Sequence, residues 1–299
     1  MLLKDWNRRG KYFTYRGRSI FYTDEGEGRF LICIHGFPTS SWDWHLLWPS
    51  LIERFRVVAP DMIGFGFSDK PADYDYSIKD QASLHEELLQ SLGVDRAHIL
   101  AHDYGVSVAQ ELLARYEERK QAGAGGLEIE SICFLNGGLF PETHRARLIQ
   151  KLLLGPLGPI ISKAISEKSF RRSFSAVFGE RTKPSDNELS DFWSIVNYKD
   201  GVKISHKIIR YIIDRRENRE RWVGAQQKTE LPMRLINGPT DPISGAHMAE
   251  RYRELIPNPD VVLLQGIGHY PQVEDPEGVL KAFWEFHDRL NRSRKERRV

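Results

Sequence analysis

The chain has 299 residues, of which 40% are hydrophobic and 28% are charged. These values are typical of a globular protein with a large buried core, and they exclude a disordered or fibrous chain. The net charge of +2 at pH 7 gives no reason to expect nucleic acid as a partner. No stretch approaches the roughly 18 uninterrupted apolar residues of a transmembrane helix, so we expect no membrane-spanning segment. The basic C-terminus, NRSRKERRV, is expected to be a solvated tail.

The first 138 residues alternate strand and helix signals. KYFTYRG and RSIFYTDEG predict a hairpin, and further strands are predicted at RFLICIHG, FRVVAPD, HILAH and IESICFLNGG. Helical spacing of apolar residues predicts helices over 41–54, 77–92 and 104–120, with Ser77 as an N-cap. The central strand runs are continuously apolar, as burial on both faces requires. This alternation predicts a mainly parallel sheet covered by helices.

From residue 139 to about 226 the strand signals stop, and apolar residues recur at helical spacing. Strand signals then return at PMRLING and DVVLLQG, followed by predicted helices over 246–256 and 274–290. We therefore predict an α/β core domain over 1–138 and 226–299 with an eight-stranded sheet. A helical cap domain over 139–225 is inserted after the sixth strand. A ligand crevice is expected at the carboxyl ends of the strands.

Two cysteines, Cys33 and Cys133, lie inside the strand-like runs FLICI and SICFL. We expect both thiols to be buried and reduced, because a disulfide between two strand interiors is the less common arrangement. No Cys or His spacing is typical of a zinc site. The sequence thus predicts a reducing, cytoplasmic location and neither a metal nor any other cofactor.

The stretch HILAHDYGVSV places Asp103 between a predicted strand and a predicted helix. This strand–turn–helix arrangement is the geometry of a nucleophile elbow, in which a sharp turn lifts the middle side chain above the sheet. Gly105 leaves room for such a turn. The usual nucleophile is Ser, and Asp103 stands in its place. The alternative is that Asp103 only caps its helix, because Asp is a favoured N-cap residue.

A nucleophile at this position needs a base, and His269 follows the last predicted strand in LLQGIGHYPQVEDP. His102 adjoins Asp103, but its side chain is expected to point away. Asp241, in RLINGPTDPIS, follows the penultimate strand and is the candidate that orients His269. The resulting chain order of nucleophile, acid and His is that of α/β-hydrolases. Glu142 is an alternative acid, and Asp241 is otherwise a turn residue.

An oxyanion hole is predicted from two backbone N–H groups. Gly36, in CIHGFPTSSWDW, lets the chain turn closely after the third strand, so that the N–H of Phe37 faces the crevice. The N–H of Tyr104, at a helix start, is the second expected donor. The glycine-rich DMIGFGFSDKP lacks the GxGxxG pattern and is expected to shape the pocket.

The motifs HGFPTSSWDW, DMIGFGFSDKP, HDYG, NGPTDP and GHYPQVEDP resemble the α/β-hydrolase superfamily, in its epoxide hydrolase and haloalkane dehalogenase branch. NGGLFPETHR, RERWVGA and VAQELLARY are most similar to the mesoderm-specific transcript group. The resemblance covers about 11–288. It implies Asp103 as nucleophile, His269 as base and Asp241 as orienting acid, beneath a helical cap.

An Asp nucleophile changes the expected reaction. A carboxylate that attacks an sp³ carbon forms an alkyl ester, which water activated by His269 then hydrolyses. The expected partners are therefore a small hydrophobic electrophile, either an epoxide or a halide, and water. An enzyme similar to epoxide hydrolases is favoured, a dehalogenase is the alternative, and a non-catalytic binding protein remains open.

The two substrate classes call for different residues. Dehalogenases of this branch typically hold the halide with a Trp after the nucleophile and an Asn after His-Gly, where this chain has Tyr104 and Phe37. Epoxide hydrolases use two cap tyrosines, for which the candidates are Tyr211 and Tyr198, with amphipathic packing as the alternative role of each. Trp42 is a third residue expected to bind substrate.

Overall fold

The computed structural model describes residues 1–296, except for the side chains of 293–295. The tail predicted to be solvated therefore lies partly outside the described residues. Eight strands form one sheet in the order β1-β2-β4-β3-β5-β6-β7-β8. β1 is antiparallel to β2 and β2 to β4, and all other neighbours are parallel. The predicted eight-stranded, mainly parallel sheet is confirmed. Its strands are β1 (Lys11–Tyr15), β2 (Arg18–Glu25), β3 (Phe30–Ile34), β4 (Arg56–Pro60), β5 (Arg96–Ala101), β6 (Glu128–Phe134), β7 (Met233–Asn237) and β8 (Val261–Leu263).

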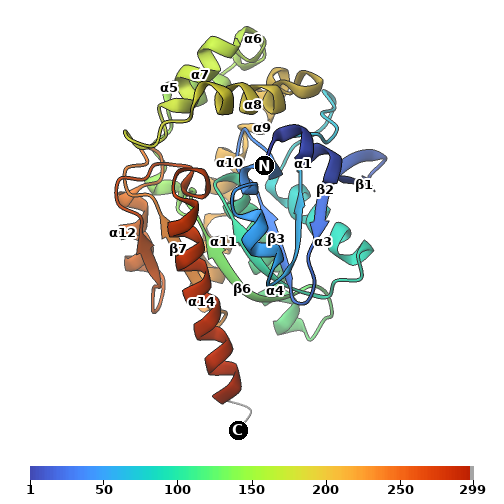
Figure 1. Cartoon of the computed structure of the whole chain (residues 1–299), viewed down its shortest axis with the longest axis vertical. Helices are drawn as coiled ribbons and strands as arrows, with labels where there is room; N and C mark the ends of the chain where they lie inside the picture. Colours follow the sequence, from blue (N-terminus) through green and yellow to red (C-terminus); the bar gives the residue numbers. More distant parts are fainter. Residues whose placement is uncertain (297–299) are drawn as a thin grey trace.

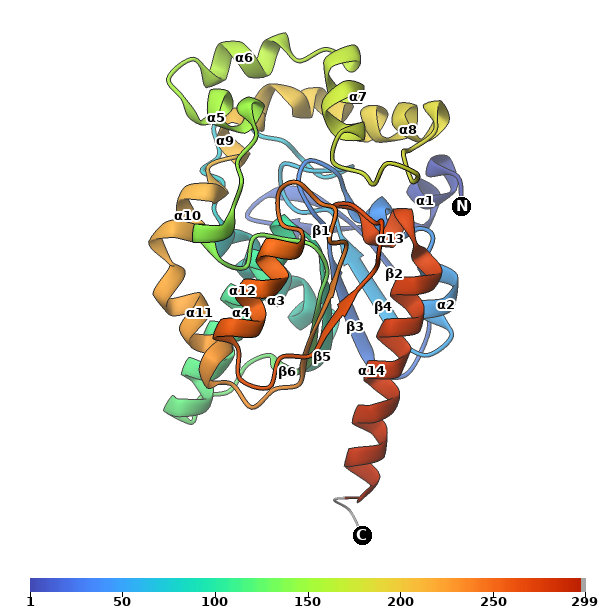
Figure 2. The same cartoon turned by 90° about the vertical axis from the view of Figure 1, so that its left-hand side faces the viewer.

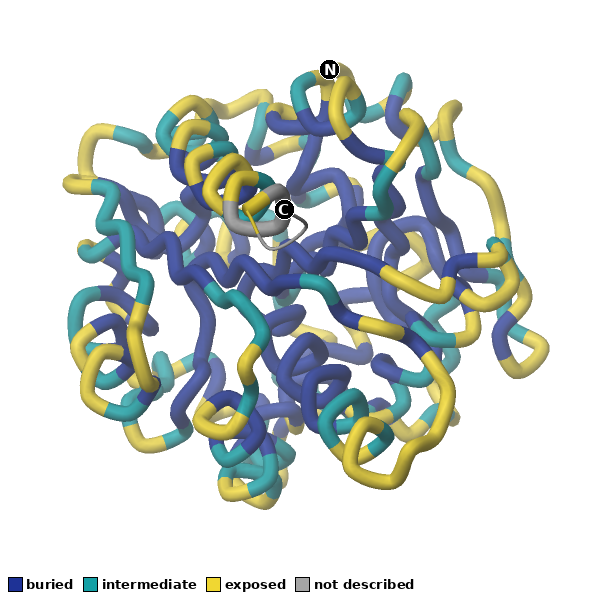
Figure 3. Tube along the Cα trace, turned by 90° about the horizontal axis from the view of Figure 1, so that it is seen from below, coloured by how far each residue is buried: buried dark blue, intermediate teal, exposed yellow. Residues whose placement is uncertain are grey.

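Helices cover both faces of this sheet (Figure 2). One face carries α3 (Ile78–Ser91), α4 (Tyr104–Ala122), α11 (Arg219–Lys228) and α12 (Ala246–Leu255). The other carries α2 (Trp48–Ile52) and α14 (Pro276–Glu296), with α13 (Pro271–Glu274) just before α14. Viewed from below, the buried strands run through the middle of the molecule, while exposed residues gather on the outer turns (Figure 3).

Alternation along β3 explains why its sequence is apolar throughout. Ile32 and Ile34 belong to the hydrophobic cluster under α3 and α4, whereas Leu31 and Cys33 belong to the cluster under α2 and α14. Successive side chains of a strand point to opposite faces of the sheet. A strand between two helical layers must therefore be apolar at every position. Cys33 and Cys133 are both buried, free thiols.

One predicted helix is wrong. In place of a helix over 41–54, the chain forms a 3₁₀ helix, Ser41–Trp44, and then the short α2. Pro49 lies in the first turn of α2. A proline there lacks the N–H that a continuous helix would need and clashes with the carbonyl four residues earlier, so the helix restarts just before it.

The segment between β6 and β7 is helical, as expected. Ser185 caps α8, with its side chain accepting from the N–H of Glu188. Figure 1 shows α5 to α8 above the upper edge of the sheet, with α9 beneath them. The helices are α5 (Leu148–Leu154), α6 (Gly158–Ala164), α7 (Glu167–Ser175), α8 (Asp186–Asn197), α9 (Ser205–Ile208) and α10 (Tyr211–Glu217), with short 3₁₀ helices at Pro141–Thr143 and Tyr198–Ile204.

The end of this inserted segment differs in packing from its beginning. α11 lies along α4, in the layer that covers the sheet. A boundary near residue 218 therefore suits the packing better than one at 226, and the two-domain division stays a prediction. Within the described residues, none of the helices is both long and apolar enough to cross a membrane.

Candidate active site

Asp103 lies at the tip of the turn between β5 and α4, with φ 43° and ψ −102°. A non-glycine residue seldom adopts positive φ, and such strain occurs where a side chain must be held in one position. The turn is close: a Cβ on Gly105 would lie 2.3 Å from the carbonyl oxygen of Ile34. The Asp103 side chain makes no capping hydrogen bond to α4. The structure thus gives the geometry of an elbow rather than that of a helix cap.

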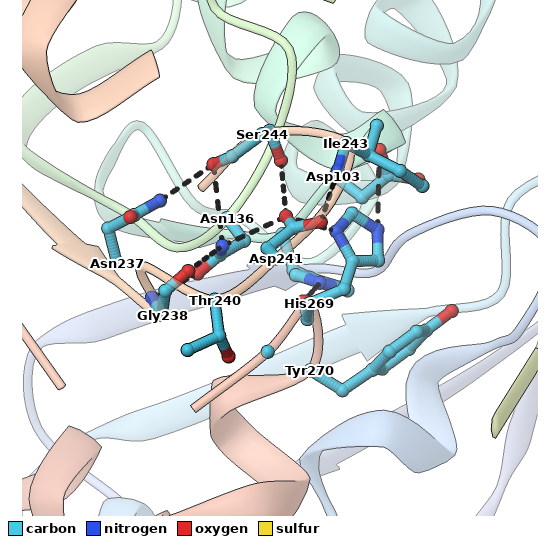
Figure 4. A network of polar contacts seen from close by, with 12 residues as sticks. Asp103, Asn136, Asn237, Gly238, Thr240, Asp241, Ile243, Ser244, His269 and Tyr270 are labelled. Atoms are coloured by element: carbon cyan, nitrogen blue, oxygen red, sulfur yellow. Dashed lines mark hydrogen bonds and ion pairs between the residues drawn. The ribbon is translucent and has the colours of Figure 1, made fainter. Parts of the chain in front are cut away.

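His269 lies between the carboxylates of Asp103 and Asp241 (Figure 4). Its Nδ1 is 2.7 Å from Oδ2 of Asp241, and its Nε2 is 3.9 Å from Oδ1 of Asp103. All three side chains are almost completely buried. The structure therefore brings together the three residues that the sequence assigns to nucleophile, base and acid.

Asp241 is held by three donors besides His269. The hydroxyl of Ser244 (2.7 Å) and the side-chain amide of Asn136 (2.9 Å) donate to Oδ2, and the N–H of Ile243 donates to Oδ1 (2.7 Å). The alternative acid, Glu142, lies elsewhere, paired with Arg219. Asp241 is the carboxylate that can fix the orientation of His269.

The pKa shifts reflect this arrangement. Burial alone would lower the pKa of His269, but the charge and hydrogen bond of Asp241, with a further contribution from Asp103, raise it to about 9. Burial opposes ionisation of Asp103, yet the charges of His269 and Arg215 hold its pKa below the ordinary value. At neutral pH the resting site therefore holds an imidazolium between two carboxylates.

Arg215, in α10, is a second buried cation at the site. Its Nη2 donates to the carbonyl oxygen of Asp103 (2.8 Å) and is 3.7 Å from Oδ1 of the same residue. Its Nε donates to the hydroxyl of Ser107 (2.6 Å), and the guanidinium lies 4.4 Å from the ring centre of Tyr211. Its Nη1 is buried without a partner among the described residues.

The predicted oxyanion donors lie at the expected elements. The N–H of Phe37 donates to Oδ2 of Asp103 (3.1 Å). One of the two predicted oxyanion donors is therefore already hydrogen-bonded to this carboxylate oxygen. Tyr104 is the first residue of α4, where an N–H has no acceptor within its own helix. The ring of Tyr104 is buried against Phe65 and Tyr211, with centroids 5.3 and 5.0 Å away.

Of the three residues predicted to bind substrate, Tyr211 is buried next to the site. Burial raises the pKa of Tyr211, and the charge of Asp103 raises it further. Tyr198 does not join it: its ring is partly exposed and lies between Lys70 and Lys199. Trp42 stacks on His45 and meets Phe192 of α8, so it joins the loop after β3 to the inserted segment.

A narrow cleft lies between the loops after β3 and β4 and the inserted segment. Its cavity volume is ≈ 10 Å³. Its lining is mostly apolar: Phe37, Pro38, Gly64, Phe65, Gly66, Lys70, Val196, Gly201, Ser205 and Ile208. Within residues 1–296, no group of three or more His, Cys, Asp or Glu side chains is arranged to hold a metal ion.

Sequence reasoning missed three features of the site. Arg215 is one of several arginines in IIDRRENRER, and no local pattern shows which of them is buried. Asn136 connects the elbow to the acid loop, since its carbonyl accepts from the N–H of Asp103 and its side chain holds Asp241. His102 turns toward the His269 loop, where its Nε2–H donates to the carbonyl of His269 (2.7 Å).

Comparisons with known proteins identify relatives of this chain. The chain is 46% identical to the mesoderm-specific transcript protein of Mus musculus over 95% of this chain and 87% of that protein. It is 34% identical to the putative hydrolase LipZ of Mycobacterium tuberculosis, over 94% and 96% of the two chains.

Similar solved structures include the epoxide hydrolase CorEH, with a TM-score of 0.77 at 21% identity over 94% of this chain and 99% of that chain. A loop variant of the haloalkane dehalogenase DbeA from Bradyrhizobium elkanii has a TM-score of 0.79 at 20% identity, over 96% and 99%. The alpha/beta hydrolase fold family matches residues 30–276. The strained elbow, the His on the last loop and these matches agree, and the chain belongs to the α/β hydrolase fold family.

Proposed function

We propose that this protein is a hydrolase with Asp103 as its nucleophile, acting on small hydrophobic epoxides. Family membership supports a hydrolase, and the environment of Asp103 supports the finer assignment. The single observation that carries this finer assignment is that the two carboxylate oxygens of Asp103 have different neighbours. Oδ2 accepts from the N–H of Phe37, whereas Oδ1 faces His269 and Arg215.

In the first step, Oδ1 attacks a ring carbon of the epoxide and the carbon–oxygen bond of the ring breaks. The ring oxygen takes a proton from Tyr211, and an alkyl ester remains on Asp103. Burial and the charge of Asp103 raise the pKa of Tyr211 in the resting site. Ester formation removes that charge, so Tyr211 becomes a better acid as the ring opens.

In the second step, His269 takes a proton from a water molecule that attacks Cγ of the ester. Once Asp103 is esterified, its negative charge no longer raises the pKa of His269. The imidazolium can then pass its proton to the Tyr211 phenolate left by the first step and act as a base. The negative charge develops on Oδ2, between the N–H groups of Phe37 and Tyr104. The Cγ–Oδ1 bond then breaks, and Oδ1 leaves as an oxygen of the product diol, taking a proton from His269. The water oxygen stays on Cγ as the new carboxyl oxygen of Asp103, whose proton returns to His269 and restores the resting site.

Tyr211 is the observation that favours an epoxide over a halide. It is a buried phenol beside Asp103, whereas the positions after Asp103 and Gly36 carry Tyr104 and Phe37 in place of the Trp and Asn expected for a halide site. The exposed position of Tyr198 leaves Tyr211 as the one predicted phenolic acid at the site.

The test is to trap the ester with His269→Gln. The variant should stop after the first step, and intact mass should show the protein carrying the whole mass of an epoxide substrate. A haloalkane would instead add its mass less hydrogen halide, which would replace the epoxide assignment by dehalogenation. Proteolysis should place the adduct on the peptide that contains Asp103.

The matched control is His206→Gln, in α9, which should turn over like the wild type and carry no adduct. If His269→Gln forms no adduct with a substrate that the wild type consumes, the covalent mechanism is wrong. If a broad set of epoxides and haloalkanes gives neither turnover nor adduct in any variant, a non-catalytic binding role replaces the proposal.

A further inference from the structure

Helices α5 and α6 expose an unusual amount of apolar surface. Among the described residues, nine large hydrophobic side chains are exposed, and four of them fall within residues 148–160. The most exposed are Leu148 (72%), Ile160 (66%) and Leu157 (60%), with Leu152 beside them. Large apolar side chains gathered in this way mark an interaction surface rather than ordinary scatter.

The segment that carries this surface is rich in basic residues. Residues 145–172 contain seven Lys or Arg and one acidic residue, Glu167. On α5, Lys151 and Leu152 lie three and four residues after Leu148, so all three share the exposed face. On α6, Lys163 lies three residues after Ile160, and both side chains are exposed on one face. Neither lysine has an ion-pair partner within the described part of the chain, so both charges are available to a partner.

The surface lies at one extreme of the molecule. In both side views α6 forms the top of the structure, opposite the end of α14 (Figures 1 and 2). A second copy of the chain is a poor occupant, because a two-fold interface would place the same cations against each other. A protein partner would need an acidic hollow that fits a protruding helix pair. A lipid surface accepts a protruding apolar ridge without such a fit.

We propose that the α5–α6 face, defined here by Leu148, Lys151, Leu152, Leu157, Ile160 and Lys163, docks on the surface of an anionic lipid bilayer. The four apolar side chains enter the boundary between headgroups and acyl chains, and the two lysines lie at the level of the lipid phosphates. This goes beyond the proposed reaction and does not depend on it. Because the inserted segment lies above the site, docking would bring the membrane close to the cap side of the molecule.

The test is flotation of the full-length protein with vesicles of phosphatidylcholine, with or without phosphatidylserine. We expect binding to the anionic vesicles that weakens as salt rises. The double variant Leu157→Ser with Ile160→Ser should bind at least roughly tenfold more weakly, because two side chains no longer leave water. Lys151→Gln with Lys163→Gln should bind roughly thirtyfold more weakly, because each lysine near an anionic surface contributes to the attraction.

Matched controls change exposed residues of the same types elsewhere on the chain. Leu2→Ser with Leu46→Ser, and Lys4→Gln with Lys281→Gln, should bind as the wild type does. The proposal is overturned if the wild type does not float with anionic vesicles, or if the controls lose as much binding as the α5–α6 variants. It is also overturned if light scattering shows a dimer that the Leu157→Ser, Ile160→Ser variant abolishes, because a second copy then covers the face.

Discussion

Replacing Asp103 with Asn should lower the pKa of His269. The change keeps the shape of the side chain and removes its charge, as an alkyl ester would. The wild-type pKa of His269 is raised to about 9, with Asp241 as the larger source of the rise and Asp103 as the smaller. The variant therefore measures the part of the pKa rise that is due to Asp103. In the proposed mechanism, ester formation must remove this part before His269 can act as a base.

The distance sets the size of the effect. Oδ1 of Asp103 is 3.9 Å from Nε2 of His269. At an effective dielectric constant of about 20, two unit charges at this distance interact by roughly 4 kcal/mol, which corresponds to about 3 pKa units. This is an upper bound, because Asp103 is the smaller source of the rise in the pKa of His269. We expect a fall of at least about one unit.

The assay is an NMR titration of histidine-labelled protein, with the His269 signal assigned from its loss in His269→Gln. Intact mass should verify that the introduced amide has not deamidated back to the carboxylate. The pKa of His206 serves as an internal reference, because burial lowers it and neither Asp103 nor His269 contributes to its shift. An unchanged or higher pKa of His269 in the variant would refute the proposed activation of the base by ester formation.

Four further outcomes are expected. Asp103→Ala should abolish turnover while the protein remains folded by circular dichroism; turnover in a folded variant would remove Asp103 as nucleophile. Tyr211→Phe should slow epoxide opening by roughly 10²–10⁴-fold in single-turnover kinetics, and an equal loss with a haloalkane would indicate a packing role. Arg215→Met should slow ester hydrolysis by roughly 10²-fold, because Oδ1 then leaves without a neighbouring cation; ester should accumulate by mass, and Arg215→Lys should restore part of the rate. Urea unfolding should show stability that is fully present below pH 6.5 and is lost as the pH rises through about 9, by roughly 3 kcal/mol, and a His269→Gln protein should lack this loss.

Much of the fold could be predicted because its signals are local. β3 is apolar at every position since it is buried on both faces, and Ser77 caps α3 because its own side chain accepts from the N–H of Asp80. The helix predicted over 41–54 is wrong because apolar spacing alone takes no account of Pro49, which interrupts a continuous helix.

Site residues could be predicted from the sequence only where they lie on a loop that directly follows a predicted strand. Asp103, His269 and Asp241 each follow a strand, and the ends of parallel strands meet at one edge of the sheet. Tyr198 shows the limit of this reasoning, since Lys199 and Asp200 adopt positive φ and the chain turns there. The periodicity of a helical segment cannot foresee such a turn. Arg215 is likewise brought to Asp103 by tertiary packing alone.

The buried charges argue that a carboxylate, rather than a hydroxyl, suits this elbow. Asp103 and Asp241 oppose Arg215 and the protonated His269, so the four charges sum to zero in the resting site. A serine in place of Asp103 would leave two buried cations against one carboxylate, and an unpaired buried charge is strongly destabilising. Opening an epoxide moves the negative charge from Oδ1 to the ring oxygen and, once that oxygen takes its proton, to Tyr211, so the negative charge stays within the site. Arg215 therefore favours a carboxylate at position 103, the nucleophile that forms an alkyl ester. It does so although it forms no part of the predicted Asp–His–Asp set.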